Sequence, residues 1–125
     1  MPSALVDTNV LIDALRGAPR AKAYLALLAR EAAPACSAIT VGEIRAGMLP
    51  DEQLDTLLFL DSLEVLPVDK ETALLGGALN EAARHQAELD DCLIAATAIR
   101  QGLPLVTRNV RHYQRAGLTV VPAAY

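Results

Sequence analysis

Short apolar runs alternate along this chain with longer stretches in which apolar residues recur every three or four positions. Short apolar runs bounded by polar or glycine positions are typical of buried strands, and the longer spacing is typical of helices. The pattern predicts strands at residues 4–6, 34–38, 63–68, 103–107 and 118–121. It predicts helices over residues 10–17, from 19 onward, over 40–47, from 51 onward, and over 69–88 and 91–100.

The order of these elements indicates the fold class. Strands that alternate with helices form a parallel sheet, because each helix carries the chain back to the edge where the next strand starts. Residues 91–100 are almost uniformly apolar, which is typical of a helix buried on more than one side. We therefore predict an α/β fold, a single domain over residues 1–125 with a short central parallel sheet of about four to five strands and helices on both faces.

Glycine, leucine and proline positions predict how some of these elements pack. Within the helix predicted at 69–88, Leu75, Leu79 and Ala82 form the expected inward stripe. The pair Gly76-Gly77 lowers helix propensity, and we expect it to permit close contact with another helix. Pro67 predicts that the strand at 63–68 lies at an edge of the sheet or ends early.

Composition adds three constraints. The chain has 53% hydrophobic residues, a mean hydropathy of +0.29 and few aromatic residues, so we expect an aliphatic core and surplus apolar surface for self-association or a partner. No apolar run approaches the roughly 18 residues that span a membrane, and no secretion signal is visible, which predicts a cytoplasmic protein. Cys36 and Cys92 lack a CxxC or Cys/His pattern, which predicts buried free thiols and argues against zinc.

The net charge of −4 conceals an uneven distribution along the chain. Residues 1–91 contain all 15 acidic residues and seven basic ones, whereas residues 92–125 contain four arginines and no acid. A basic C-terminal segment leaves nucleic-acid binding open, although charge alone favours a solvated face. The candidates for a basic border to a ligand cleft are Arg108, Arg111, His112 and Arg115.

Three acidic residues stand where a strand passes into a helix or a helix begins: Asp7, Glu43 and Asp91. In a parallel α/β protein, strand C-termini and helix N-termini share one edge of the sheet, where ligand crevices form. Carboxylates gathered there repel one another unless a cation lies between them, and Mg²⁺ and Mn²⁺ prefer such hard oxygen ligands. The pattern therefore predicts a metal-dependent phosphoryl-transfer site.

Each acid also has a structural interpretation. Thr40 and Glu43 match a capping box, in which the Glu side chain bonds back to the Thr amide. Asp91, or Asp90 beside it, fits an N-cap or a complement to the helix dipole. Asp7 is harder to explain in this way, because Thr8 or Asn9 can cap the following turn instead. Three acids at three independent element ends favour the metal site.

Four segments of the chain resemble the motifs of PIN-domain proteins, in the same order and with matching spacing. They are LVDTNVLID at 5–13, TVGEIRAG at 40–47, DCLIAATA at 91–98 and LVTRN at 105–109. The resemblance covers nearly the whole chain and is strongest to the VapC-like toxins of bacterial toxin–antitoxin pairs. It implies a cytoplasmic, Mg²⁺- or Mn²⁺-dependent endoribonuclease that forms a homodimer and is inhibited by a cognate antitoxin protein.

The resemblance also implies roles for individual residues. Asp7, Glu43 and Asp91 would be the metal-binding catalytic carboxylates, with Asn109 as a further catalytic residue. Thr8, Asn9 and Thr107 would support them. In the expected reaction, a metal-activated water attacks the RNA phosphodiester in line. The phosphate contacts expected to help neutralise the transition state come from Arg108 and Arg111.

The chain departs from the family pattern after Thr107. Many PIN domains have a further acid in this segment, where this chain has Asn109 and His112. Losing one negative charge implies one tightly held ion, with a second arriving with the RNA phosphate. His112 ranks behind the carboxylates as a ligand, because a lone histidine is usually structural or solvated.

Three rival interpretations remain open at this level. A response-regulator receiver domain has a similar size, but it needs an acidic pair after the first strand and a late lysine, whereas the last lysine here is Lys70. A non-catalytic PIN-fold module that binds RNA or protein would fit the missing acid. A plain interaction domain would use all three acids as caps.

Overall fold

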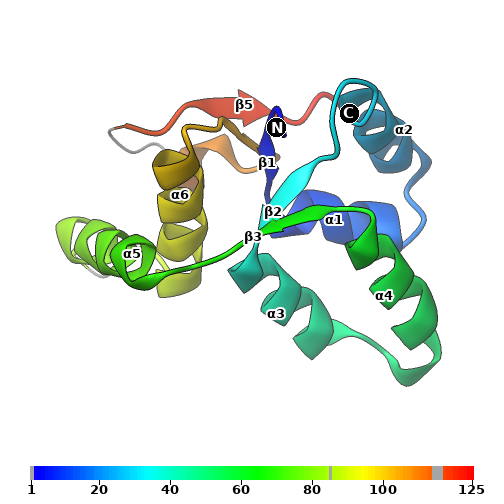
Figure 1. Cartoon of the computed structure of the whole chain (residues 1–125), viewed down its shortest axis with the longest axis horizontal. Coiled ribbons are helices and arrows are strands. Elements are labelled where there is room, and N and C mark those ends of the chain that lie inside the picture. Colours follow the sequence, from blue (N-terminus) through cyan, green and yellow to red (C-terminus); the bar gives the residue numbers. More distant parts are fainter. Residues whose placement is uncertain (1, 85, 114–116) are drawn as a thin grey trace.

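The computed structural model describes residues 2–84, 86–113 and 117–125, which form one five-stranded sheet with helices on both sides (Figure 1). The strand order is β3-β2-β1-β4-β5, and every pair of neighbours is parallel. The strands are β1 (Leu5–Val6), β2 (Ala35–Ser37), β3 (Glu64–Leu66), β4 (Leu105–Thr107) and β5 (Val120–Pro122). The predicted α/β class is confirmed.

Two α-helices follow each of the first three strands, and the short turn η2 follows β4. The α-helices are α1 (Thr8–Leu15), α2 (Pro19–Leu28), α3 (Ala38–Gly47), α4 (Gln53–Asp61), α5 (Lys70–Ala82) and α6 (Leu89–Gln101). Two short 3-10 turns are η1 (Pro50–Glu52) and η2 (Val110–Tyr113). Within the part of the chain that the structure describes, no helix has both the length and the apolar character needed to cross a membrane.

Adjacent residues of the central strand feed two separate cores, because successive side chains of a strand point to opposite faces. Leu5 belongs to a cluster with Ile94 of α6 and Leu105 of β4. Val6 belongs to a second cluster, which includes residues of α1, α2, α3 and α4. The α5–α6 pair therefore covers one face, and the other face is covered mainly by α1, α2 and α4 (Figure 1).

The connections at the carboxyl edge of the sheet are very short, and this positions the candidate site. Asp7 alone separates β1 from α1, and α3 begins immediately after β2. Since the strands are parallel, β1, β2 and β4 end at the same edge, and the Asp7 amide still bonds the Val106 carbonyl across the sheet at 2.9 Å. Residues that follow these strands are therefore brought close together.

Several element boundaries differ from the predicted ones. Helix α3 begins at Ala38 and not at Thr40, because the Ser37 hydroxyl accepts a hydrogen bond from the Ile39 amide and acts as the N-cap. Helix α5 ends at Ala82, well before residue 88, and α6 begins at Leu89 rather than Asp91. The prediction from Pro67 is confirmed, since β3 is an edge strand that ends at Leu66.

The predicted inward stripe of α5 is confirmed only in part, at Leu79, which packs against the core cluster of Leu5 and Ile94. The buried residues of this helix are Thr72, Gly76 and Asn80, whereas Leu75 and Leu79 are half-buried and Ala82 is exposed. The reason is that α5 packs closely against α6, so the face of the helix that carries the smaller side chains turns inward. The close helix contact predicted from the glycine pair is confirmed at Gly76, which lies against Leu93.

The surplus apolar surface expected from composition is present on α4 and the turn before it. The exposed fractions are 58% for Leu49, 70% for Leu54, 45% for Leu57 and 59% for Leu58. Cys36 and Cys92 are both buried and free, as predicted. Burial raises the pKa of the Cys36 thiol to about 11, which keeps it protonated and unreactive at neutral pH.

The contact between α5 and α6 gives a prediction with an internal control. A Cβ atom at Gly76 would lie 2.5 Å from Leu93 Cδ2 and 3.1 Å from Leu93 Cα, so Gly76→Ala forces the helices apart. We expect it to lower the free energy of unfolding by about 1–3 kcal/mol. Urea denaturation followed by circular dichroism measures this change.

Gly77→Ala is the matched control, because a Cβ atom at Gly77 meets nothing within 4 Å. Alanine has the higher helix propensity, so this variant should gain roughly 0.5–1 kcal/mol. Equal effects of the two substitutions would contradict the close packing at Gly76.

Candidate active site

The three acidic residues singled out from the sequence reach the carboxyl edge of the sheet from three helices. Asp7 is the N-cap of α1, Glu43 lies within α3, and Asp91 lies in the first turn of α6. Asp7 is nearly fully buried, with 4% of its surface exposed, whereas Glu43 and Asp91 are half-buried. The site is therefore a partly buried acidic cluster rather than an open charged face.

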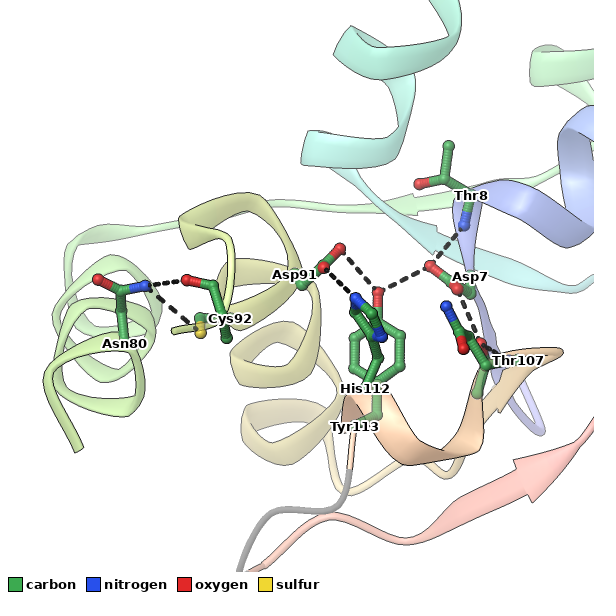
Figure 2. Close-up of polar contacts among 10 residues, drawn as sticks. Asp7, Thr8, Asn80, Asp91, Cys92, Thr107, His112 and Tyr113 are labelled. Atoms are coloured by element: carbon green, nitrogen blue, oxygen red, sulfur yellow. Dashed lines mark hydrogen bonds and ion pairs between the residues drawn. The ribbon is translucent and has the colours of Figure 1, made fainter. Parts of the chain in front are cut away.

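Asp7 is held by three hydrogen bonds (Figure 2). Its Oδ1 accepts from the Thr8 amide at 2.8 Å and from the Tyr113 hydroxyl at 2.9 Å. Its Oδ2 accepts from the Thr107 hydroxyl at 2.8 Å, and Thr107 Oγ1 in turn accepts from the Asn109 amide at 3.0 Å. The β1 end, the β4 end and η2 thus fix the orientation of one carboxylate.

Tyr113 joins Asp7 to Asp91. Its hydroxyl lies 3.1 Å from Asp91 Oδ1, so one phenol stands between the two carboxylates (Figure 2). Only 3% of Tyr113 is exposed, and its ring packs in the same core cluster as Leu5 and Ile94. Burial raises the pKa of the Tyr113 hydroxyl well above its usual range, and the negative charges of both carboxylates raise it further. The phenol therefore keeps its proton and acts as a donor.

Glu43 is joined to the same network through Thr8. The Thr8 hydroxyl donates to Glu43 Oε1 at 2.7 Å and lies 2.9 Å from the Thr40 hydroxyl. Because Thr8 has one hydroxyl hydrogen and gives it to Glu43, Thr40 must donate to Thr8. Hydroxyl and amide donors thus connect Glu43, Asp7 and Asp91 into one network.

The electrostatics of the site reflect its excess of negative charge. Burial raises the pKa of Glu43; the Thr8 hydrogen bond lowers it, and the charges of Asp90, Asp91 and Asp7 raise it. Burial also raises the pKa of Asp91; the bond from Tyr113 lowers it, and Asp7 raises it. Both carboxyl groups therefore take up protons more readily than usual, which a nearby cation would reverse.

The capping interpretations of these acids were wrong in detail. Asp7, not Thr8 or Asn9, is the N-cap of α1, and its carboxylate accepts from the Thr8 amide. The capping box of Thr40 and Glu43 is absent because α3 begins two residues before Thr40, and Glu43 bonds Thr8 instead. Asp91 is also not a cap, since α6 begins at Leu89, although its place in the first turn complements the helix dipole.

The other predicted residues lie at different distances from this network. Asn9 and Asn109 have exposed side chains, and Asn109 joins the network only through its backbone amide. Arg108 Nε lies 3.0 Å from Asp13 Oδ2, which also accepts from the Tyr125 hydroxyl at 2.6 Å. The basic residues beyond it have different positions: Arg111 is exposed, His112 Nε2 lies 3.9 Å from Asp91 Oδ2, and Arg115 falls outside the described residues.

Sequence reasoning missed Tyr113 and Asp90 and misassigned Thr40. Tyr113 carries no charge and follows the basic segment, so the only available signal was a scarce aromatic residue in a chain with three tyrosines. Asp90 was considered only as a cap, yet it lies close enough to Glu43 and Asp91 to raise the pKa of both. Thr40 is fully buried and supports Thr8.

The carboxylate oxygens of the site suit a hard divalent cation, but the three carboxylates together do not converge on one point. Across residues 2–84, 86–113 and 117–125, no three His, Cys, Asp or Glu side chains are close enough to hold a metal ion together. Asp7 and Asp91 form the tightest pair, since one hydroxyl contacts both. Mg²⁺ is commonly bound through one or two carboxylates while it keeps several waters, so this pair is sufficient in kind and number.

Comparison with known proteins identifies the family of this chain. The PIN domain family matches residues 4–118. Ribonuclease VapC19 of Mycobacterium tuberculosis is 36% identical to the chain over 113 residues, which cover 87% of this chain and 90% of the relative. Ribonuclease VapC10 of the same organism is 35% identical over 112 residues, which cover 87% and 84%.

A solved toxin–antitoxin complex from Klebsiella pneumoniae contains a chain with the same fold. The two chains superpose with a TM-score of 0.81 and 32% identity, over 98% of each. The segment that matches the PIN domain family, residues 4–118, includes Asp7, Glu43, Asp91 and Tyr113. It contains strands β1 to β4 but not β5. The chain therefore belongs to the PIN domain family.

Proposed function

We propose that this protein is a divalent-metal-dependent endoribonuclease and the toxin of a toxin–antitoxin pair. The observation that carries the proposal is the hydroxyl-linked network, in which Asp7, Glu43 and Asp91 gather at one edge of the sheet. The relatives named as ribonucleases support RNA as the substrate. The missing acid at Asn109 favours a non-catalytic RNA- or protein-binding module instead.

The chain supplies the ligands and the orientation for a cation. Asp7 and Asp91 would hold the ion, and Glu43 would add the third negative charge beside it. Mg²⁺ or Mn²⁺ bound there would neutralise charge on a phosphate and lower the pKa of a water molecule. Thr8 and Thr107 keep Glu43 and Asp7 in fixed orientations, which matters because a loosely held ligand loses affinity and activity.

The basic residues after β4 would contact the RNA backbone. Arg111 is exposed and follows β4 in sequence. The side chain of Arg108 is 50% exposed even though it pairs with Asp13. Contacts of arginine with phosphate increase affinity but carry little information about base sequence. The chain thus has the means to hold RNA across the acidic cluster without strong sequence selection by these two residues.

The proposed partner is an antitoxin protein, and the proposed assembly is a homodimer. The Klebsiella pneumoniae chain that shares this fold was solved in a toxin–antitoxin complex. The exposed leucines of α4 provide the apolar surface that such an association would bury.

Replacing Glu43 with glutamine tests the proposed function. The amide oxygen can still accept the Thr8 hydrogen bond, so we expect the fold to be retained. The amide removes the third negative charge beside the ion, and we expect at least about a tenfold loss of metal-dependent RNA cleavage. The measurement is cleavage of a mixed RNA pool by both proteins with Mn²⁺ and with EDTA.

Glu81→Gln is the matched control for Glu43→Gln, because Glu81 is exposed on α5 on a different part of the fold. It should cleave like the wild type. Discrete products from wild type and Glu81→Gln, but not from Glu43→Gln, are the expected result. Wild-type RNA binding without cleavage in Mn²⁺ would favour the non-catalytic module.

The acidic cluster also predicts a pH dependence in the absence of metal. The pKa of Asp91 is raised in the folded protein, so the folded state binds protons more readily than the unfolded state between the two pKa values. The free energy of unfolding therefore increases as the pH falls through that window and decreases as the pH rises through it. In EDTA at neutral pH, Asp91→Asn should melt at a higher temperature than the wild type.

Thermal melts from neutral pH down to the ordinary carboxyl range check this prediction. The difference between Asp91→Asn and wild type should shrink as the pH falls, because the wild-type carboxyl group becomes neutral too. Saturating Mn²⁺ should reverse the order at neutral pH, since an ion that binds only the folded state stabilises it. A wild type that melts higher than Asp91→Asn in EDTA at neutral pH would contradict the repulsion.

A further inference from the structure

The hydroxyl of Tyr113 is the only described side-chain group that contacts both Asp7 and Asp91. It lies 2.9 Å from Asp7 Oδ1 and 3.1 Å from Asp91 Oδ1, from a ring that is 3% exposed (Figure 2). A phenol has one hydrogen, so it can donate fully to one carboxylate at a time. The second carboxylate then faces a lone pair of the phenol oxygen, and a nearby cation would relieve the repulsion between them.

Counting lone pairs shows which carboxylate oxygens remain for an ion. Asp7 Oδ1 already accepts from both Thr8 and Tyr113, whereas Oδ2 accepts from Thr107 alone. Asp91 Oδ1 faces Tyr113, and Oδ2 lies 3.9 Å from His112, which is too far for a hydrogen bond. Each carboxylate thus has one oxygen against the phenol and a second oxygen with acceptor capacity to spare.

We infer that Tyr113 is a positioning residue for the cation site, whose hydroxyl holds one oxygen of Asp7 and one of Asp91 so that their other oxygens face a single divalent ion. The inference rests on the proposed function. It assigns to a residue outside the acidic set the task of fixing the spacing between two ligands that would otherwise repel each other.

The surroundings of Tyr113 suit this role. Its ring packs in the core cluster that includes Leu5, Ile94 and Leu105, so the hydroxyl is fixed by the sheet and by α6. Asp7 follows β1, and Asp91 lies on α6. A hydroxyl attached to a rigid ring between these elements transmits the packing of the core to the ligand positions, as groups that orient metal ligands commonly do.

Positioning has a consequence that depends on the ion. Mg²⁺ requires nearly ideal octahedral geometry at about 2.0–2.1 Å, whereas Ca²⁺ accepts oxygen ligands at roughly 2.3–2.6 Å in flexible arrangements. Loosening the spacing of the two carboxylates should therefore weaken Mg²⁺ more than Ca²⁺. Losing a hydrogen bond without any positioning effect would weaken both ions alike.

Tyr113→Phe tests the inference, because it removes one oxygen and keeps the ring that packs in the core. Mn²⁺ affinity is measured by the electron paramagnetic resonance signal of free Mn²⁺, and Mg²⁺ and Ca²⁺ affinities by displacement of bound Mn²⁺. We expect Tyr113→Phe to bind Mn²⁺ and Mg²⁺ about tenfold more weakly than wild type, with a smaller loss for Ca²⁺. Circular dichroism checks that the variant is folded.

Tyr24→Phe is the matched control. Tyr24 is also buried, at 9% exposed, and its ring lies 5.8 Å from that of Tyr125. Among the described residues its hydroxyl makes no polar contact with the acidic network, so all three affinities should match those of wild type.

The possible results separate this inference from the proposed function. Wild type that binds no Mn²⁺ overturns both. Wild type that binds Mn²⁺ while Tyr113→Phe binds it equally or more tightly overturns only the role of Tyr113, and tighter binding would mean that the hydroxyl competes with the ion. If Tyr113→Phe loses Mg²⁺ affinity and Ca²⁺ affinity equally, the positioning role of Tyr113 is also overturned, but the proposed function is not.

Discussion

Mutual repulsion among buried carboxylates at the carboxyl edge of the sheet is the constraint on which the rest of the site depends. Asp7, Glu43 and Asp91 are brought together by three helices, and burial raises the pKa of Glu43 and Asp91. The fold tolerates this arrangement because hydroxyl groups on Thr8, Thr107 and Tyr113 donate to the carboxylates. These donors carry no charge, so they orient the acids without neutralising them. The site therefore keeps a net negative charge.

The sheet creates this concentration of charge through its connections. Asp7 is the single residue between β1 and α1, so its position is fixed by the sheet on one side and by the helix on the other. Thr107 ends the neighbouring strand β4 and donates to the same carboxylate, although the two residues are 100 positions apart in sequence. Two adjacent parallel strands thus act as the rigid base of the site, which is the kind of support that precise ligand geometry requires.

The described arginines of the C-terminal segment do not pair with Asp7, Glu43 or Asp91. Arg108 follows Thr107 directly, yet it pairs with Asp13, which Tyr125 also contacts. Among the described basic residues, the one that pairs with Asp91 is the exposed His112, at 3.9 Å. A direct arginine–carboxylate pair would neutralise part of the acidic cluster, so its absence among the described residues leaves the site with a net negative charge.

The sequence by itself determined the α/β class, the shared edge of the sheet and the three acids gathered there, because these follow from alternation of apolar segments and from parallel strand geometry. It misplaced the start of α3, since Ser37 and Thr40 are both acceptable caps and only the path of the chain out of β2 selects between them. Only the tertiary structure decided that Thr8 would join Glu43 to the network and that Tyr113 would bridge two carboxylates. Asp7 and Tyr113 are 106 residues apart, and no local pattern encodes a hydrogen bond that depends on how the sheet, α6 and η2 pack together.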